Sequence, residues 1–354
     1  MRTSESTSNT SENGARPRWW LGAISGVAVA VIIAVMSVIV LGPTTADSPP
    51  LIGGGATIPV TVERHLYPAA DADPTQNYGD LYLPRTREPT PVVVLIHGGG
   101  WNKRFGASVL REEAQRLAHR GVVVWNIEYR RVGSGGGWPH TFVDVAAAVD
   151  HLTALHTTHT DIDLTRVIVV GHSAGGQLAA WTASRTLLAS GKPGAHPRIV
   201  PLHVFSLAGV LDMRAAADAG NDRVIRVLGG KPLQVPGRYR TASPIEHISS
   251  RIPVTLYHGL RDNIVPASQA VDYATRARAH NAPVNVVILP RATHPSLVDA
   301  ASPDWHRIEN DILTVAGDHR TPQETTLALN PDDHAAGARS RSTMGNPHNT
   351  RSDS

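Results

Sequence analysis

The segment from Val167 to Gln177 constrains the fold of this chain most strongly. It begins with four β-branched apolar residues, typical of a buried parallel strand, and continues as Gly171-His172-Ser173-Ala174-Gly175. This G-x-S-x-G pattern fits a sharp strand-to-helix turn, in which two glycines let the strand and the helix approach while the serine hydroxyl is exposed. Ser173 is therefore the candidate nucleophile. A glycine turn without a catalytic role has the same pattern, so the rest of the chain has to supply the serine's partners.

The composition limits the classes of protein to which the chain can belong. Its 354 residues are enough for one large α/β domain with terminal extensions. The 33 lysines and arginines against 30 acidic residues give a net charge of +3 without basic runs, which argues against a nucleic-acid partner. There are no cysteines, so disulfides, thiol nucleophiles and thiolate metal sites are excluded.

The N-terminal part of the chain predicts a membrane anchor. Residues 1–18 are polar and predict a disordered cytoplasmic segment, whereas the uncharged segment Trp19–Leu41 would, as a helix, cross roughly 30 Å of bilayer hydrocarbon. Arg16 and Arg18 precede this segment and the next basic residue is Arg64, so the positive-inside rule places the rest of the chain outside the cytoplasm. We expect a single-pass protein of the cell membrane with an uncleaved signal anchor. The alternative is secretion after cleavage of a signal peptide.

Beyond a linker rich in proline and glycine at residues 42–58, strands and helices alternate up to residue 317. This alternation predicts a mostly parallel sheet with helices on both faces, opened by an antiparallel pair of strands. Residues 318–354 are polar and predict a disordered tail. The antiparallel pair is expected at residues 60–67 and 80–83, and the parallel strands at 91–96, 122–127, 166–170, 199–207, 254–258 and 284–289.

An acid and a histidine follow the nucleophile in the order that this architecture requires. Side chains at the carboxyl ends of parallel strands meet at one edge of the sheet. His294 follows the last strand and is the candidate general base, with His306, inside the next predicted helix, as the alternative. Asp262 follows the preceding strand and would accept the Nδ1 proton of His294, although it could instead cap the helix that begins near Pro266. Asp212 is the alternative acid.

A glycine-rich loop, His97-Gly98-Gly99-Gly100-Trp101, comes directly after the strand at residues 91–96. Attack on a carbonyl group places negative charge on its oxygen, and fixed backbone amides about 3 Å away stabilise that charge. The expected donors are the amides of Gly99, Gly100 and Ala174, while His97 holds the loop. A phosphate-binding loop is the alternative, but no Lys-Ser/Thr pair follows the glycines.

Taken together, these motifs resemble those of the α/β-hydrolase esterases with an H-G-G-G-W oxyanion loop, and more narrowly the kynurenine formamidase-like and feruloyl/acetylxylan esterase-like branch. The resemblance covers residues 60–316 and implies an α/β-hydrolase fold at residues 59–317, with an eight-stranded sheet and a small cap at about 209–250. The chain departs from the pattern at Asn102-Lys103-Arg104, where such proteins often have a glycine. Further matching segments are Gly79–Pro84, Glu128–Arg131, Trp138–Pro139, Asp144–Val145 and Ala242–Ile245.

The residues and the resemblance predict a serine carboxylic ester hydrolase. His294 deprotonates Ser173, Asp262 orients His294, and water releases an acyl-enzyme. A small-molecule ester is the expected substrate, with Trp101 and Trp138 as candidate walls of its pocket, and no metal or organic cofactor is expected. The alternatives are an arylformamidase that acts on N-formylkynurenine, a peptidase of the same fold and a non-catalytic interaction domain.

Overall fold

The structure, a computed structural model, describes residues 58–86 and 88–317. The predicted N-terminal disordered segment, the anchor at residues 19–41, nearly all of the linker and the tail at residues 318–354 lie outside the described residues. Among the helices that the structure describes, none is both long and apolar enough to span a bilayer.

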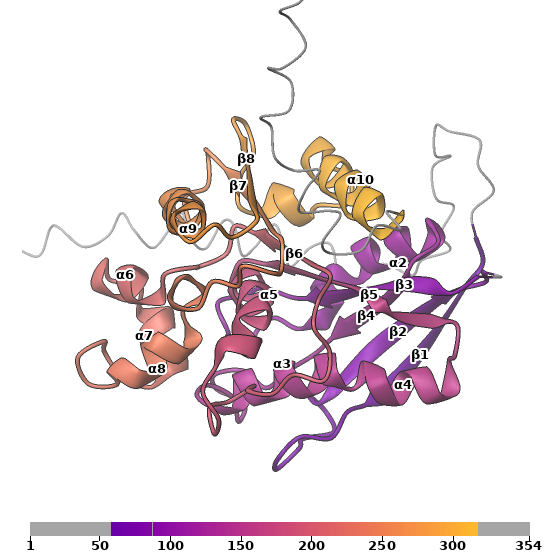
Figure 1. Cartoon of the computed structure of the whole chain (residues 1–354), viewed down its shortest axis with the longest axis horizontal. Coiled ribbons are helices and arrows are strands. Elements are labelled where there is room, and N and C mark those ends of the chain that lie inside the picture. Colours follow the sequence, from indigo (N-terminus) through magenta and orange to yellow (C-terminus); the bar gives the residue numbers. More distant parts are fainter. Residues whose placement is uncertain (1–57, 87, 318–354) are drawn as a thin grey trace, which may run out of the picture. The chain divides into compact units, whose positions relative to one another are not determined.

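Within the described ranges, eight strands form one sheet in the order β1-β2-β4-β3-β5-β6-β7-β8 (Figure 1). The pairs β1–β2 and β2–β4 are antiparallel, and the remaining neighbours are parallel. The predicted mostly parallel sheet of eight strands is thus confirmed. The strands are β1 Val60–Leu66, β2 Tyr78–Pro84, β3 Thr90–Ile96, β4 Val123–Ile127, β5 Ile162–His172, β6 His203–Leu207, β7 Val254–Gly259 and β8 Val284–Leu289.

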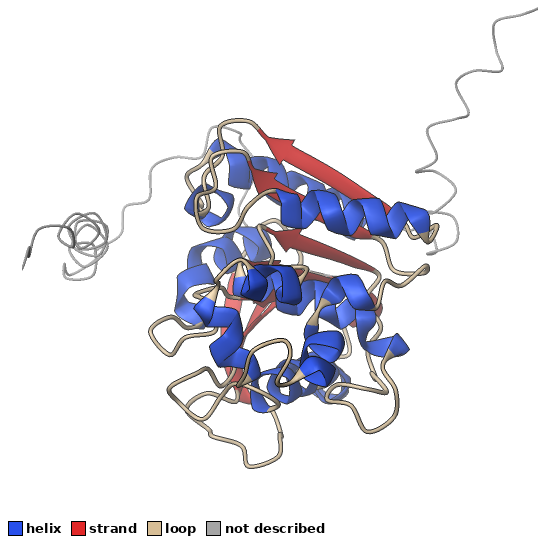
Figure 2. Ribbon diagram, turned by 90° about the vertical axis from the view of Figure 1, so that its left-hand side faces the viewer, coloured by secondary structure: helices blue, strands red, loops and turns tan. Residues whose placement is uncertain are grey.

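Helices cover both faces of this sheet (Figures 1 and 2). Two separate clusters of buried side chains result, one containing Leu117 and Trp305, the other Phe142 and Leu178. The central strands are buried on both sides, which explains their unbroken apolar runs, whereas in the edge strand β1 only Val60, Glu63 and His65 are partly buried. The helices are α2 Arg111–His119 and α10 Pro303–Gly317 on one face, and α3 His140–Asp150, α4 Leu152–Thr158, α5 Ala174–Ser184 and α9 Ser268–Ala279 on the other.

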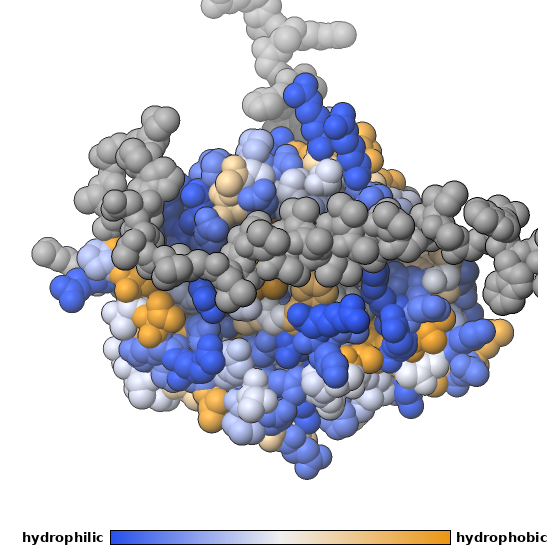
Figure 3. All heavy atoms as spheres, turned by 180° about the vertical axis from the view of Figure 1, so that it is seen from behind, coloured by the Kyte–Doolittle hydropathy of each residue, from blue (hydrophilic) through white to orange (hydrophobic). Residues whose placement is uncertain are grey.

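Three short α-helices lie between β6 and β7, in the segment where a cap is expected. They are α6 Met213–Asp218, α7 Asp222–Leu228 and α8 Pro236–Ala242, and they group together beside the sheet (Figure 1). On the face of the molecule shown in Figure 3, hydrophobic residues are scattered among hydrophilic ones. This mixture is that of an ordinary polar surface.

One buried acid on α2 makes the stability of the fold depend on pH. Glu113 is 3% exposed, and its Oε2 atom has no hydrogen-bond partner among the described residues. Burial raises the pKa of Glu113 to about 7. An unfolded glutamate has a pKa of about 4.3. Between about pH 4 and 7 the folded protein therefore keeps a proton on Glu113 that the unfolded chain has lost, so the free energy of unfolding falls as the pH rises through this range.

We therefore expect Glu113→Gln to raise the free energy of unfolding at pH 8 by about 1–3 kcal/mol and to change it much less at pH 4. Urea denaturation at the two pH values measures this difference. The exposed neighbour offers a control, since Glu112→Gln should change the free energy of unfolding by less than about 0.5 kcal/mol at either pH. A gain from Glu113→Gln that is the same at both pH values would contradict the assigned ionisation.

Candidate active site

Ser173 stands in a strained turn between β5 and α5. Its φ of 57° and ψ of −118° are far from the regions that side-chain-bearing residues ordinarily adopt. The backbone amide of Ser173 donates a 2.8 Å hydrogen bond to the carbonyl oxygen of Leu207 at the end of β6. The residue is 7% exposed. The neighbouring strand thus holds the serine in a conformation that it would not adopt alone.

The glycines on either side of Ser173 are required by close backbone approach. A Cβ atom on Gly171 would lie 2.1 Å from the carbonyl oxygen of Gly175, and one on Gly175 would lie 2.0 Å from that of Ile96. Neither contact can be relieved by moving a flexible side chain, because both oxygens belong to the backbone. The physical reason inferred for the G-x-S-x-G spacing agrees with this geometry.

His294 and Asp262 are brought together from the loops after β8 and β7. Nδ1 of His294 donates a 2.7 Å hydrogen bond to Oδ2 of Asp262, whose side chain is fully buried. Oδ1 of Asp262 accepts hydrogen bonds from the amides of Ile264 and Val265 at 2.8 and 2.9 Å. Burial alone would raise the pKa of Asp262, but the hydrogen bonds from His294 and from these amides outweigh it, so the pKa lies below its ordinary value.

The alternative residues considered from the sequence have other roles in the structure. Asp212 caps α6, where its carboxylate accepts a 2.9 Å hydrogen bond from the amide of Ala215. His306 lies within α10, and its Nε2 donates to the carbonyl oxygen of Ala300 at 3.1 Å. Asp262 binds the amides of its own loop and not those of α9, which begins six residues later at Ser268. The geometry therefore groups Asp262 with His294.

His172 joins the serine turn to the loop that carries His294. Its Nε2 donates a 2.9 Å hydrogen bond to the carbonyl oxygen of His294, and the two rings lie 4.5 Å apart. Burial lowers the pKa of His172 to about 3, so the ring is neutral at physiological pH. Among the described residues, no hydrogen bond joins the Ser173 hydroxyl to the His294 ring. At active sites such a bond often forms only when substrate is present. This role of His172 could not be inferred from the sequence, since His172 occupies a variable position of the G-x-S-x-G motif.

The loop after β3 has the backbone geometry of an amide-lined turn. Gly99 and Gly100 have φ values of 104° and 62°, and within the described residues neither amide donates a hydrogen bond to the protein. Ala174 is the first residue of α5, where backbone amides have no partner in the helix. All three predicted donors are thus available to a ligand.

His97 holds this loop in place, as expected from the sequence. Its Nε2 lies 2.9 Å from Oε1 of Glu128 and its Nδ1 lies 2.8 Å from the carbonyl oxygen of Gly98, while its ring stacks on Tyr129 at 4.4 Å. Glu128 also accepts hydrogen bonds from Arg131 and from the amide of Ala107. With both ring nitrogens engaged, His97 fixes the position of the loop.

The two tryptophans suggested as pocket walls are held in different surroundings. Trp101 is 1% exposed, and its Nε1 donates to Oε1 of Gln177 at 3.1 Å. Trp138 is partly buried and packs on Phe142, with ring centroids 5.3 Å apart. Neither residue lines the cleft described next, so their role as pocket walls stays a prediction.

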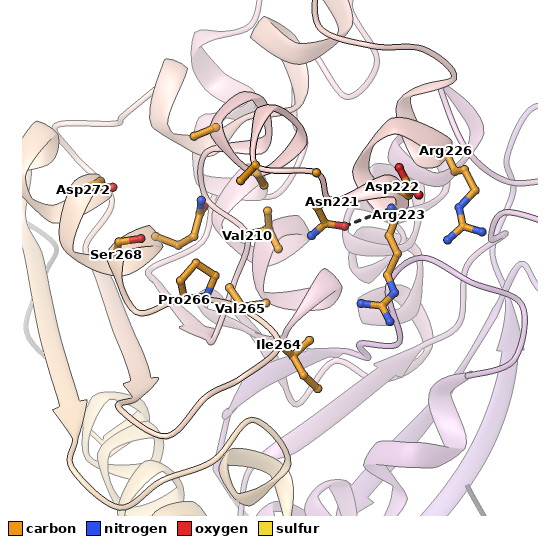
Figure 4. A pocket seen from close by; sticks show the side chains of 15 residues that line it. Val210, Asn221, Asp222, Arg223, Arg226, Ile264, Val265, Pro266, Ser268 and Asp272 are labelled. Carbon is orange, nitrogen blue, oxygen red and sulfur yellow. Dashed lines mark hydrogen bonds between the residues drawn. The ribbon is translucent and has the colours of Figure 1, made fainter. Parts of the chain in front are cut away.

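A cleft of about 740 Å³ lies between α7 and the loop that connects β7 to α9 (Figure 4). It adjoins the catalytic candidates at two points. Ile264 and Val265, whose amides bind Asp262, form part of its lining. Arg223 of α7 also lines it and packs on the oxyanion loop, because a Cβ atom on Gly100 would lie only 2.6 Å from Cδ of Arg223. The sequence did not single out Arg223, since the fold of the cap could not be inferred from it.

The order of the sheet, the strained serine turn and the Asp-His pair at the same sheet edge define an α/β hydrolase. More narrowly, the chain belongs to the BD-FAE family, whose sequence model matches residues 79–276. The resemblance to α/β-hydrolase esterases is confirmed at this level, whereas the narrower branch stays a prediction.

Individual relatives support the same fold. The chain is 30% identical over 234 residues to esterase LipC of Mycobacterium tuberculosis, an alignment that covers 62% of this chain and 57% of LipC. It is 26% identical over 215 residues to esterase LipQ of the same organism, covering 58% of this chain and 50% of LipQ. The chain thus spans between half and two thirds of the length of these curated relatives. Among solved structures, a truncated carbohydrate esterase from gut microbiota has a TM-score of 0.62 at 19% identity, covering 74% of this chain and 98% of that one.

The close approach at the serine turn gives a direct test. We expect Gly175→Ala to lower the free energy of unfolding by about 1–3 kcal/mol or more, because the added Cβ atom collides with backbone. Urea denaturation followed by circular dichroism measures the change. Gly237→Ala in α8 is the matched control, since a Cβ atom there meets nothing closer than 4.0 Å, and alanine should leave stability unchanged or raise it. Equal effects of the two substitutions would show that the turn is not as tightly packed as described.

Proposed function

We propose that the protein is a serine carboxylic ester hydrolase that works through Ser173, His294 and Asp262. The observation that carries this proposal is the 2.7 Å hydrogen bond between His294 and a fully buried Asp262, at the same sheet edge as the strained Ser173. Each of the three residues follows a different parallel strand, so the sheet holds all of them in place. The names of the relatives LipC and LipQ, both esterases, support the same reaction.

The first half of the proposed reaction forms an acyl-enzyme. Nε2 of His294 accepts the hydroxyl proton of Ser173 while Oγ attacks the ester carbonyl carbon. The amides of the loop at Gly99 and Gly100, with that of Ala174, donate hydrogen bonds to the resulting oxyanion. When the tetrahedral intermediate collapses, the C–O bond to the alcohol breaks, and the alcohol leaves with the proton from His294.

The second half returns the enzyme to its starting state. A water molecule loses a proton to His294 and attacks the acyl carbon, after which the acid is released and Ser173 recovers its proton. The carboxylate of Asp262 stabilises the imidazolium that forms in each half. Its lowered pKa keeps it ionised throughout the neutral range. The formamidase alternative uses the same groups on an N-formyl amide and ranks second, because the relatives cited above are named as esterases.

We also propose that the segment Trp19–Leu41 anchors this domain outside the cytoplasm, with secretion after cleavage as the alternative. The support is the uncharged character of the segment and the arginines that precede it. In that location the substrate would be a small-molecule ester outside the cytoplasm.

Hydrolysis of 4-nitrophenyl acetate tests the proposed chemistry. We expect the wild-type protein to hydrolyse it and Ser173→Ala to lower kcat/KM by at least about 10³-fold, because no nucleophile remains. Ser184→Ala provides the matched control, since Ser184 is a buried serine at the far end of the same helix, and its removal should leave kcat/KM within about twofold. Equal rates for wild type and Ser173→Ala, or no hydrolysis by either, would contradict the proposal.

A further inference from the structure

Two histidines and a glutamate gather at the edge of the sheet away from the serine. Glu63 and His65 lie two residues apart on β1 and therefore point to the same face of the strand. His159 follows the C-terminal end of α4. Nε2 of His65 lies 3.1 Å from Oε2 of Glu63, and Nε2 of His159 lies 3.4 Å from the same oxygen. One carboxylate oxygen thus faces both imidazoles.

The spacing of these atoms is that of ligands around a small metal ion. The three donor atoms all lie within 4.8 Å of one another. In a tetrahedral zinc site, with metal–donor distances of about 2.0–2.2 Å, neighbouring donors lie about 3.3–3.5 Å apart. The two separations of 3.1 and 3.4 Å are close to this range. The rings of His65 and His159 are perpendicular, with centroids 5.7 Å apart, so their planes do not stack against each other.

The donor set and its exposure suit a divalent cation of intermediate softness. Two imidazoles and one carboxylate form a common set of three protein ligands for Zn²⁺, with a fourth position left to water. The side chains of His65 and His159 are 27% and 18% exposed, and that of Glu63 is 41% exposed. The donors are therefore held by the fold while the site stays open to ions from solvent.

We propose that Glu63, His65 and His159 bind one Zn²⁺ ion. In the sheet, β2, β4 and β3 separate β1 from β5, which carries Ser173, so the ion takes no part in ester hydrolysis. It joins the edge strand β1, which pairs only with β2 in the described sheet, to the segment just before β5. The ion therefore stabilises the edge strand β1, which has backbone hydrogen bonds to the described sheet on one side only.

Zinc titration of the full-length, untagged and EDTA-dialysed protein by isothermal calorimetry tests the site. Wild type is expected to bind one Zn²⁺ at this site, and His65→Ala and His159→Ala to raise Kd at least about tenfold, because loss even of a group that only orients a ligand costs 10–100-fold. Zn²⁺ is also expected to raise the Tm of wild type and not that of His159→Ala.

Two control variants make the outcome specific. His280→Ala removes an exposed histidine elsewhere on the surface, and His294→Ala removes the candidate base; both should bind Zn²⁺ as wild type does. Absence of binding to wild type overturns the proposal, as does binding that His65→Ala and His159→Ala leave unchanged. In either case the three residues form a polar cluster and no metal site.

A second, independent observation concerns the cleft beside the oxyanion loop. Arg223 and Arg226 lie one turn apart on α7, and both line the cleft (Figure 4). Within the part of the chain that the structure describes, neither guanidinium takes part in an ion pair or a hydrogen bond. Asp222 and Asp272 also line the cleft without pairing with them. The side chain of Arg223 packs on Gly100, a predicted oxyanion donor. This contact places the charge of Arg223 beside the candidate reaction centre.

Resting on the proposed function, we infer that Arg223 binds an anionic group of the substrate. A guanidinium presents donors in a planar fork that matches a carboxylate, and hydrogen bonds between charged groups are the stronger ones. The substrate class is then an ester that carries a carboxylate on its acyl or alcohol part, near enough to the scissile carbonyl to span from Gly100 to Arg223.

Two nitrophenyl esters separate this inference from the proposed function. The ratio of kcat/KM for mono-4-nitrophenyl glutarate to that for 4-nitrophenyl butyrate is expected to fall about 10–100-fold in Arg223→Ala, the effect of losing a charged hydrogen bond. Arg214→Ala removes an exposed arginine of α6 that pairs with Asp218 and should leave the ratio unchanged. A ratio unchanged in Arg223→Ala overturns the role of Arg223 alone, whereas a wild type that hydrolyses neither ester overturns the proposed function as well.

Discussion

The packing of backbone against backbone at the serine turn is the constraint on which the rest of the site depends. Gly175 approaches the carbonyl oxygen of Ile96 so closely that no side chain fits, and Ser173 has a positive φ that is held by its hydrogen bond to Leu207. The turn is thereby fixed by β3 on one side and β6 on the other. Strain of this kind persists only where the surroundings over-determine the conformation, and here the central strands of the sheet do so.

Hydrogen bonds extend this fixed turn to the other loops of the site. The ring of His172 binds the backbone of His294, whose own ring binds Asp262. Asp262 is in turn held by the amides of Ile264 and Val265, which also line the cleft. The candidate base, the acid and one wall of the cleft are therefore positioned by one connected set of contacts. A substrate in the cleft would lie against the same loop that fixes the acid.

Much of the architecture could be predicted from the sequence, because buried parallel strands leave unbroken apolar runs and their carboxyl ends meet at one edge. That rule placed Ser173, Asp262 and His294 near each other from their order alone. The strand expected at residues 199–207 is shorter in the structure, His203–Leu207, since Pro201 has no amide hydrogen for the ladder. Contacts such as Arg223 on Gly100, or Glu63 beside His159, join distant segments and have no periodic signal, so they required the structure.

The central claim is that Ser173 is the nucleophile that His294 activates. Reaction of the full-length protein with diethyl 4-nitrophenyl phosphate, followed by tandem mass spectrometry, tests it most directly, because the reagent phosphorylates an activated serine and releases one nitrophenol. One diethylphosphoryl group is predicted per chain, on the peptide that contains Ser173, with labelling strongly slowed in His294→Ala. Labelling of a different serine, or ester hydrolysis that persists after Ser173 is fully modified, would contradict the claim.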